Sequence, residues 1–106
     1  MLLAIDVGNT HVVIGAFHGE DITHHWRIAT HGGKTEDEIG LILLELLERS
    51  HLDANDVNGI VIGSVVPTLT ESLFYMAQKY FKIKPLVVNG RIKTGMPILM
   101  DNPVEV

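Results

Sequence analysis

The residues best suited to chemistry lie near the N-terminus, in the run Asp6-Val7-Gly8-Asn9-Thr10. Gly8 and Asn9 add little bulk, so successive backbone N–H groups of such a turn lie open to an anion such as phosphate. Thr10 adds a hydroxyl donor. Asp6 follows an apolar run, where a carboxylate is suited to hold Mg²⁺ through water, beside the phosphates that the ion neutralises. The run therefore has the composition of a phosphate and magnesium site.

The same run also fits a purely structural turn. Gly8-Asn9 is a common pair in hairpins because both residues tolerate positive φ, and Asp6 can accept hydrogen bonds within its own turn. Short glycine motifs give many false positives, so spacing alone favours neither interpretation. The chain has neither Gly-x-x-x-x-Gly-Lys nor Gly-x-Gly-x-x-Gly, which excludes the P-loop and Rossmann phosphate sites.

Three segments that carry and follow this turn have the pattern of strands. Residues 2–7 are apolar except for Asp6, residues 12–17 form a second apolar run, and residues 22–29 alternate loosely. Short connections rich in Gly, Asn and Asp separate the three, as in an antiparallel meander. The first is apolar on both faces, as a central strand would be. One face of the third is expected to carry Ile22, His24, Trp26 and Ile28.

After Thr35 the spacing of the apolar residues changes to that of a helix. Thr35 and Glu38 have the spacing of a capping box, and apolar residues follow at helical spacing up to Ser50. Leu41 and Leu44 widen the apolar arc, which predicts a helix that is covered on more than one side.

A second helix is expected to open at residues 67–71. Thr68 and Glu71 repeat the spacing of a capping box. A strand is expected before this helix at 60–66, another after it at 86–88, and 98–100 has the pattern of a further short strand. The core stripe of the helix would be Leu69, Leu73, Met76, Ala77 and Tyr80.

The predicted order is therefore βββαβαβ, an α/β mixed sheet with helices packed on it. Right-handed crossovers place the strand at 60–66 beside the first strand and parallel to it. Ligands of such sheets bind outside the carboxyl ends of the strands, and the N-terminus of a helix favours anions. Ser64 and Thr68, each of which alone fits a capping role, are thus expected to converge with Asp6 on one crevice.

Composition limits the class of protein. The chain has 106 residues, enough for one domain or one lobe of a two-lobed protein. Its net charge of −5 argues against a protein that binds nucleic acid through a basic face. It lacks cysteine, which excludes disulfides, zinc ribbons and thiol catalysis. Without a long apolar run or a secretory signal, we expect a cytoplasmic protein with no membrane contact.

Taken together, the motifs resemble the type III pantothenate kinases, which belong to the actin/hexokinase/Hsp70-like superfamily. The resemblance covers essentially the whole chain, in order and at the expected spacing. It rests on residues 6–10, 26–28, 35–38, 64–67, 93–98 and 101–106. It implies a ribonuclease-H-like fold and makes residues 1–106 a single N-terminal ATP-phosphate-binding lobe, cut from a two-lobed kinase.

The resemblance also implies a reaction. Such enzymes transfer the γ-phosphate of ATP to pantothenate, giving 4'-phosphopantothenate in the first step of coenzyme A biosynthesis. They use Mg²⁺ and a monovalent cation, K⁺ or NH₄⁺, and a homodimer is expected of the full-length protein. Asp6 would hold the hydrated magnesium ion. The ATP phosphates would bind to Asp6, Val7, Gly8, Asn9, Thr10, His11, Val12 and Val13.

The chain departs from the family in two ways. The family's next segment, Gly-Ala-Asp-Arg, carries the general base, and it would begin just after Val106. No catalytic base is therefore expected within the chain, and the chain alone should not turn over. Met100 stands where the family usually has a tyrosine near the substrate. Methionine fills the apolar volume but has no phenolic donor, so substrate identity is the inference most affected.

Two other functions stay open. A non-catalytic regulatory or interaction domain of the same superfamily would explain the missing base and Met100, but it has no need of a phosphate-binding turn. Another enzyme on this fold, such as a sugar kinase or a polyphosphatase, would share residues 6–10 but not the run 93–106.

Overall fold

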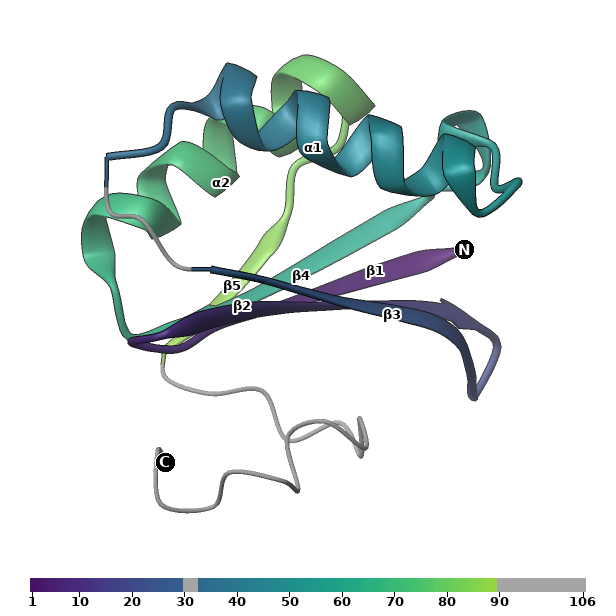
Figure 1. Ribbon diagram of the computed structural model, residues 1–106, viewed down its shortest axis with the longest axis horizontal. Coiled ribbons are helices and arrows are strands. Elements are labelled where there is room, and N and C mark those ends of the chain that lie inside the picture. Colours follow the sequence, from purple (N-terminus) through teal and green to yellow (C-terminus); the bar gives the residue numbers. More distant parts are fainter. Residues whose placement is uncertain (30–32, 90–106) are drawn as a thin grey trace.

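In the computed structural model, which describes residues 1–29 and 33–89, five strands form one mixed sheet and two helices cover one of its faces (Figure 1). The strands are β1 (Leu2–Val7), β2 (His11–His18), β3 (Asp21–Ala29), β4 (Gly59–Ser64) and β5 (Leu86–Asn89). The helices are α1 (Glu36–Arg49), α2 (Pro67–Phe81) and a short 3-10 helix, η1 (Ala54–Asp56). This confirms the predicted order, with η1 added in a polar connection. The strand predicted at 98–100 lies outside the described residues.

The strand order is β3-β2-β1-β4-β5, so β1 is central. Strand β2 is antiparallel to both β1 and β3, whereas β4 is parallel to β1 and to β5. The predicted meander and the predicted parallel pairing of the first and fourth strands are therefore both confirmed. The first strand is buried from its second residue onward, as its central position requires.

Strand residues alternate between two buried faces. Leu3, Ile5 and Val7 of β1 join the larger core under the helices, with Leu43 of α1 and Leu73 of α2. A smaller cluster lies on the face away from the helices and consists of Ala4, Val13 and Phe17, with Ile22 and Val61 packed against it. Both faces of the central strands are thus covered.

A β-bulge changes the facing of strand β3. Ala16 pairs with His24 and Phe17 with Ile22, which leaves Thr23 as an extra residue on β3. Ile22 therefore packs on the face away from the helices, while Trp26 packs against the helix-side core. The prediction that these residues share one face is wrong for Ile22, because an inserted residue reverses the alternation.

Helix α1 begins with the predicted capping box. The Glu38 backbone N–H donates to Thr35 Oγ1 (3.2 Å), and the Thr35 N–H donates to Glu38 Oε1 (3.0 Å). Ile39, Gly40, Leu43 and Leu47 are buried, but 62% of Leu41 is exposed. The prediction that Leu41 widens a covered arc is wrong, because a residue two positions from Ile39 and Leu43 lies on the opposite side of a helix.

Helix α2 begins at Pro67, with Val66 as its N-cap and no side-chain capping bond. The predicted capping box of Thr68 and Glu71 is wrong. Proline at the first helical position fixes φ and has no N–H to satisfy, which places Thr68 inside the first turn. The predicted core stripe is confirmed for four residues, whereas Tyr80 is only half-buried. The four are Leu69, Leu73, Met76 and Ala77.

Thr35 and Thr68 allow a matched test of helix capping. We expect Thr35→Ala to lower the free energy of unfolding by about 1 kcal/mol, because it removes an N-cap acceptor. Thr68→Ala removes no cap and should change it by less than about 0.5 kcal/mol. Urea denaturation followed by circular dichroism measures both. Equal losses from the two variants would contradict this assignment of the caps.

The two helices are joined by a polar contact at their surface. Lys79 Nζ and Tyr80 Oη, both on α2, donate to Asp37 Oδ1 on α1 at 2.8 and 2.7 Å. These hydrogen bonds, from Lys79 first and then Tyr80, lower the pKa of Asp37 below its ordinary 3.8. The same contacts with Asp37 raise the pKa of Lys79 and of Tyr80.

This contact makes stability depend on pH in a defined direction. A carboxyl group whose pKa is lower in the folded state stabilises that state at pH values above its unfolded pKa. The stabilisation by Asp37 should therefore be complete above about pH 5 and fall as pH drops through 3.8 towards the lowered folded pKa. We expect urea midpoints of the wild type and Asp37→Asn to converge in acid. A constant difference from pH 7 to pH 3 would contradict the contact.

Candidate functional site

The β1–β2 connection forms the predicted tight hairpin. The Gly8 N–H donates to the His11 carbonyl oxygen at 2.9 Å, which closes the turn around Asn9 and Thr10. Gly8 is buried, whereas Asn9 and Thr10 are exposed, and Thr10 Oγ1 lies 3.2 Å from His11 Nδ1. The turn thus presents the two small polar residues of the motif to solvent.

The backbone of this turn differs from the prediction in one respect. Over residues 1–29 and 33–89, positive φ occurs at Gly19, His51 and Lys82. The prediction of positive φ at Gly8-Asn9 is therefore wrong.

Asp6 is the one charged side chain that is buried among the described residues, with 1% of its surface exposed. Alternation along β1 places it on the face away from the helices, because Ile5 and Val7 belong to the helix-side core. Its partners in register are Val13 on β2 and Gly63 on β4. A carboxylate buried at this depth is costly unless a donor or a cation compensates it, which marks Asp6 as a candidate functional group.

The carboxyl end of β4 lies beside this turn. Val65 N–H donates to the Val7 carbonyl oxygen at 3.2 Å, and α2 begins two residues later. Figure 1 shows the β1–β2 and β4–α2 connections at the same edge of the sheet. The backbone segments expected to meet in one crevice therefore do meet.

The side chain of Ser64 does not converge on Asp6. Ser64 pairs with Val7, so it lies on the helix side of the sheet, one position out of step with Asp6. Its hydroxyl accepts from the Val66 N–H (3.0 Å) and closes a local turn. Thr68 is exposed in the first turn of α2. The prediction is thus wrong for the Ser64 side chain, which closes a local turn instead.

The eight residues expected around phosphate divide between the two faces. Val7 and Val12 are packed in the helix-side core, so only their backbone groups face a ligand at the turn. Val13 is the register partner of Asp6, and both lie on the face of the sheet away from the helices. His11 is half-buried at the start of β2. Met100, the expected substrate contact, lies outside the described residues.

Arg27 is a candidate that the sequence analysis did not single out. It pairs with Val13, which in turn pairs with Asp6, so Arg27 shares the face of Asp6 two strands away. Strand spacing puts the two Cα atoms about 10 Å apart. Arg27 is exposed, and its guanidinium suits an anionic ligand. The alternation of side chains along a strand could have identified Arg27, because a core-facing Trp26 requires Arg27 to point to the opposite face.

The donor set fits magnesium better than a metal that prefers nitrogen or sulfur ligands. Mg²⁺ keeps several waters and takes one or two carboxylates together with substrate phosphates, and the Asp6 carboxylate beside an exposed polar turn fits this requirement. Within residues 1–29 and 33–89, no three histidine or acidic side chains gather in a way that could cage a metal. Over the same residues, no helix has the length and apolarity needed to cross a membrane.

The sheet order and the two helices on one face define an α/β fold with a five-stranded mixed sheet. A solved structure from Porphyromonas gingivalis, a proposed N-acetylglucosamine kinase, matches 85% of the chain with a TM-score of 0.61 at 16% identity. The match covers 34% of that protein, and at this identity it shows the fold alone. The predicted fold class is therefore confirmed.

Sequence comparison identifies the family. The model of the type III pantothenate kinase family matches residues 2–106. The chain is 49% identical to the type III pantothenate kinase of Geobacillus kaustophilus (strain HTA426) and 51% identical to that of Moorella thermoacetica (strain ATCC 39073 / JCM 9320). Both matches cover all 106 residues. The chain belongs to the type III pantothenate kinase family. It spans about two fifths of those relatives, 41% and 42% of their length.

Proposed function

We propose that this chain is the N-terminal, ATP-phosphate-binding lobe of an enzyme that phosphorylates pantothenate in coenzyme A biosynthesis. The observation that carries the proposal is the buried carboxylate of Asp6, next to the Gly8–Thr10 turn, in a chain of this family. A regulatory or interaction domain would gain nothing from a carboxylate at that depth. Membership of the family supports pantothenate as the substrate, and the buried carboxylate beside the turn supports phosphate binding.

The residues would share the task as follows. Backbone N–H groups of the turn and the Thr10 hydroxyl would hold the β- and γ-phosphates of ATP. Asp6 would orient the waters of a bound Mg²⁺ ion, which neutralises charge on the phosphates when present. Arg27, on the same face, would add positive charge along the path of the transferred group. Phosphoryl transfer depends chiefly on such positioning and charge neutralisation.

The rest of the machinery belongs to the proposal as well. The general base would follow Val106, in a second lobe that also supplies a site for K⁺ or NH₄⁺. We propose a cytoplasmic homodimer for the longer protein, with ATP and pantothenate as its ligands and no nucleic acid or membrane partner. The 106-residue chain alone would bind nucleotide weakly and would not turn over.

A phosphotransfer assay tests this function. We expect the protein, extended to the length of its relatives, to convert pantothenate and ATP to phosphopantothenate and ADP, and to leave N-acetylglucosamine unreacted. The 106-residue chain should form no product under the same conditions. Sustained turnover by the chain alone would overturn the division into lobes. Phosphorylation of the sugar in place of pantothenate would overturn the substrate.

A further inference from the structure

The peptide unit between Val7 and Gly8, where the chain leaves β1 and enters the turn, is held from two sides. Its carbonyl oxygen, on Val7, accepts from the Val65 N–H at 3.2 Å. Its N–H, on Gly8, donates to the His11 carbonyl oxygen at 2.9 Å. Because a peptide unit is planar, these two hydrogen bonds together fix the direction in which the chain enters the turn.

The Ser64 hydroxyl shapes the loop that supplies the first of these two donors. The hydroxyl oxygen accepts from the Val66 N–H at 3.0 Å, and the hydroxyl donates to the Val66 carbonyl oxygen at 3.1 Å. Both backbone groups of Val66 are thus bonded to one side chain, which closes a tight loop directly after β4. Val65 is the residue enclosed by this loop, so the direction of its N–H depends on the Ser64 hydroxyl.

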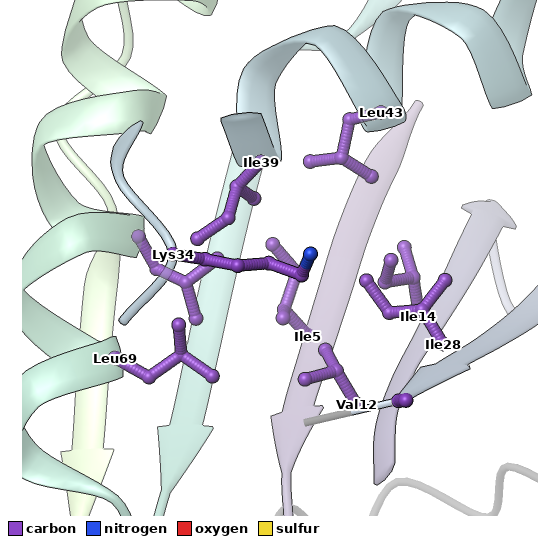
Figure 2. A pocket seen from close by; sticks show the side chains of 10 residues that line it. Ile5, Val12, Ile14, Ile28, Lys34, Ile39, Leu43 and Leu69 are labelled. Carbon is purple, nitrogen blue, oxygen red and sulfur yellow. The ribbon is translucent and has the colours of Figure 1, made fainter. Parts of the chain in front are cut away.

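The far end of the loop is anchored in the core. The Val66 carbonyl oxygen also accepts from the Thr70 N–H of α2 at 3.0 Å. Leu69, in the first turn of α2, is buried and lines the same narrow gap under the helices as Ile5 of β1 (Figure 2). Since the start of α2 is fixed to the sheet in this way, loosening the loop would displace Val65 rather than the helix.

We propose that Ser64 is a positioning residue for nucleotide binding, which acts through Val65 on the peptide unit between Val7 and Gly8. The proposal rests on the proposed function of the β1–β2 turn. Ser64 pairs with Val7 and lies on the helix side of the sheet, opposite to Asp6, so it acts without touching the nucleotide. A turn whose amides are oriented in advance binds phosphate more tightly, because less ordering is needed on binding.

Steady-state kinetics of the protein, extended to the length of its relatives, test the proposal with Ser64→Ala. The variant leaves the Val66 N–H without its acceptor. We expect KM for ATP to rise about three- to tenfold and KM for pantothenate to stay within about twofold of the wild type. A role in stability alone would lower the active fraction, and with it kcat, but it would leave KM for ATP unchanged.

Three further variants serve as controls. Ser64→Thr keeps a hydroxyl at the same position and should keep KM for ATP near the wild-type value, whereas Ser64→Cys, with a weaker acceptor, should give an intermediate value. Ser72→Ala is the matched control on α2. The Ser72 hydroxyl donates to the Thr68 carbonyl oxygen at 3.5 Å, so its removal takes no acceptor from a backbone N–H, and KM for ATP should not change.

Amide hydrogen exchange gives a readout that does not depend on activity. In the absence of nucleotide, the amides of Gly8 and Val65 should exchange several-fold faster in Ser64→Ala than in the wild type or in Ser72→Ala, because their hydrogen bonds open more often. Unchanged exchange at Gly8 together with a raised KM for ATP would overturn the action through Val65.

The remaining outcomes separate this proposal from the proposed function. If Ser64→Ala left KM for ATP unchanged, the role of Ser64 would be overturned and the phosphate site would stand. If the wild-type protein failed to bind Mg-ATP, the proposed function would be overturned, and with it any role of Ser64 in nucleotide binding. Faster exchange at Gly8 in Ser64→Ala would then report a structural contact only.

Discussion

Replacing Asp6 by Asn should abolish magnesium-dependent nucleotide binding by the chain, and it should lower kcat of the longer enzyme by roughly 100-fold or more. The asparagine has nearly the shape of the aspartate, so the packing between Val13 and Gly63 should persist. What disappears is the negative charge that we propose holds the hydrated cation beside the phosphates. Isothermal titration with Mg-ATP measures the binding loss, and a coupled ADP assay measures the rate.

Asp21→Asn is the matched control for this experiment. Asp21 is also a strand carboxylate, but it is exposed at the start of β3, by the β2–β3 turn. We expect this variant to bind Mg-ATP and to turn over as the wild type does. If Asp6→Asn retained magnesium-dependent binding, the carboxylate at the end of β1 would have a structural role only.

The largest effect on stability is expected at Gly40, where α1 crosses α2. A Cβ atom placed on Gly40 would lie 2.5, 2.6 and 2.9 Å from Cδ2, Cε2 and Cγ of the Tyr80 ring. The ring cannot move aside cheaply, because its hydroxyl is bonded to Asp37 at 2.7 Å. We expect Gly40→Ala to lower the free energy of unfolding by about 1–3 kcal/mol, despite alanine's better helix propensity.

Two further variants isolate the cause of this loss. Gly33→Ala adds the same methyl group where no atom lies within 4 Å, and it should change stability by less than about 0.5 kcal/mol. In a Tyr80→Ala background the clash is gone, so Gly40→Ala should become neutral or stabilising. Urea midpoints give all three values. A Gly40→Ala loss that persisted without the Tyr80 ring would contradict the close approach as its origin.

Much of the fold follows from periodicity. The strands, the two long helices and the parallel pairing of β1 with β4 were all predictable from apolar spacing and right-handed crossovers. The errors have local causes. The bulge at Thr23 adds a residue that alternation alone does not reveal, and Pro67 displaces the cap that the spacing of Thr68 suggested. Leu41 shows that an apolar residue within a helix need not lie on its covered face.

The candidate site was predictable only in part, because the sequence does not reveal the register between strands. A carboxylate at the end of an apolar central strand is visible in the sequence, and so is the turn that follows it. Which face each neighbour takes is a property of register. Ser64 pairs with Val7 rather than with Asp6, and Arg27 shares the Asp6 face through Val13. A shift of one residue reverses such an assignment, so the pairing of strands had to be known.

Titration of the ¹⁵N-labelled chain with Mg-ATP tests directly whether the β1–β2 turn binds the phosphates of ATP. We expect saturable shifts of the backbone amides from Gly8 to Val13. We expect no such shifts with adenosine, which lacks phosphates, or in Asp6→Asn. The amides of Leu43 and Leu47, in the core under the helices, should stay in place with Mg-ATP. Shifts of equal size with adenosine, or shifts confined to residues outside the turn, would contradict the claim.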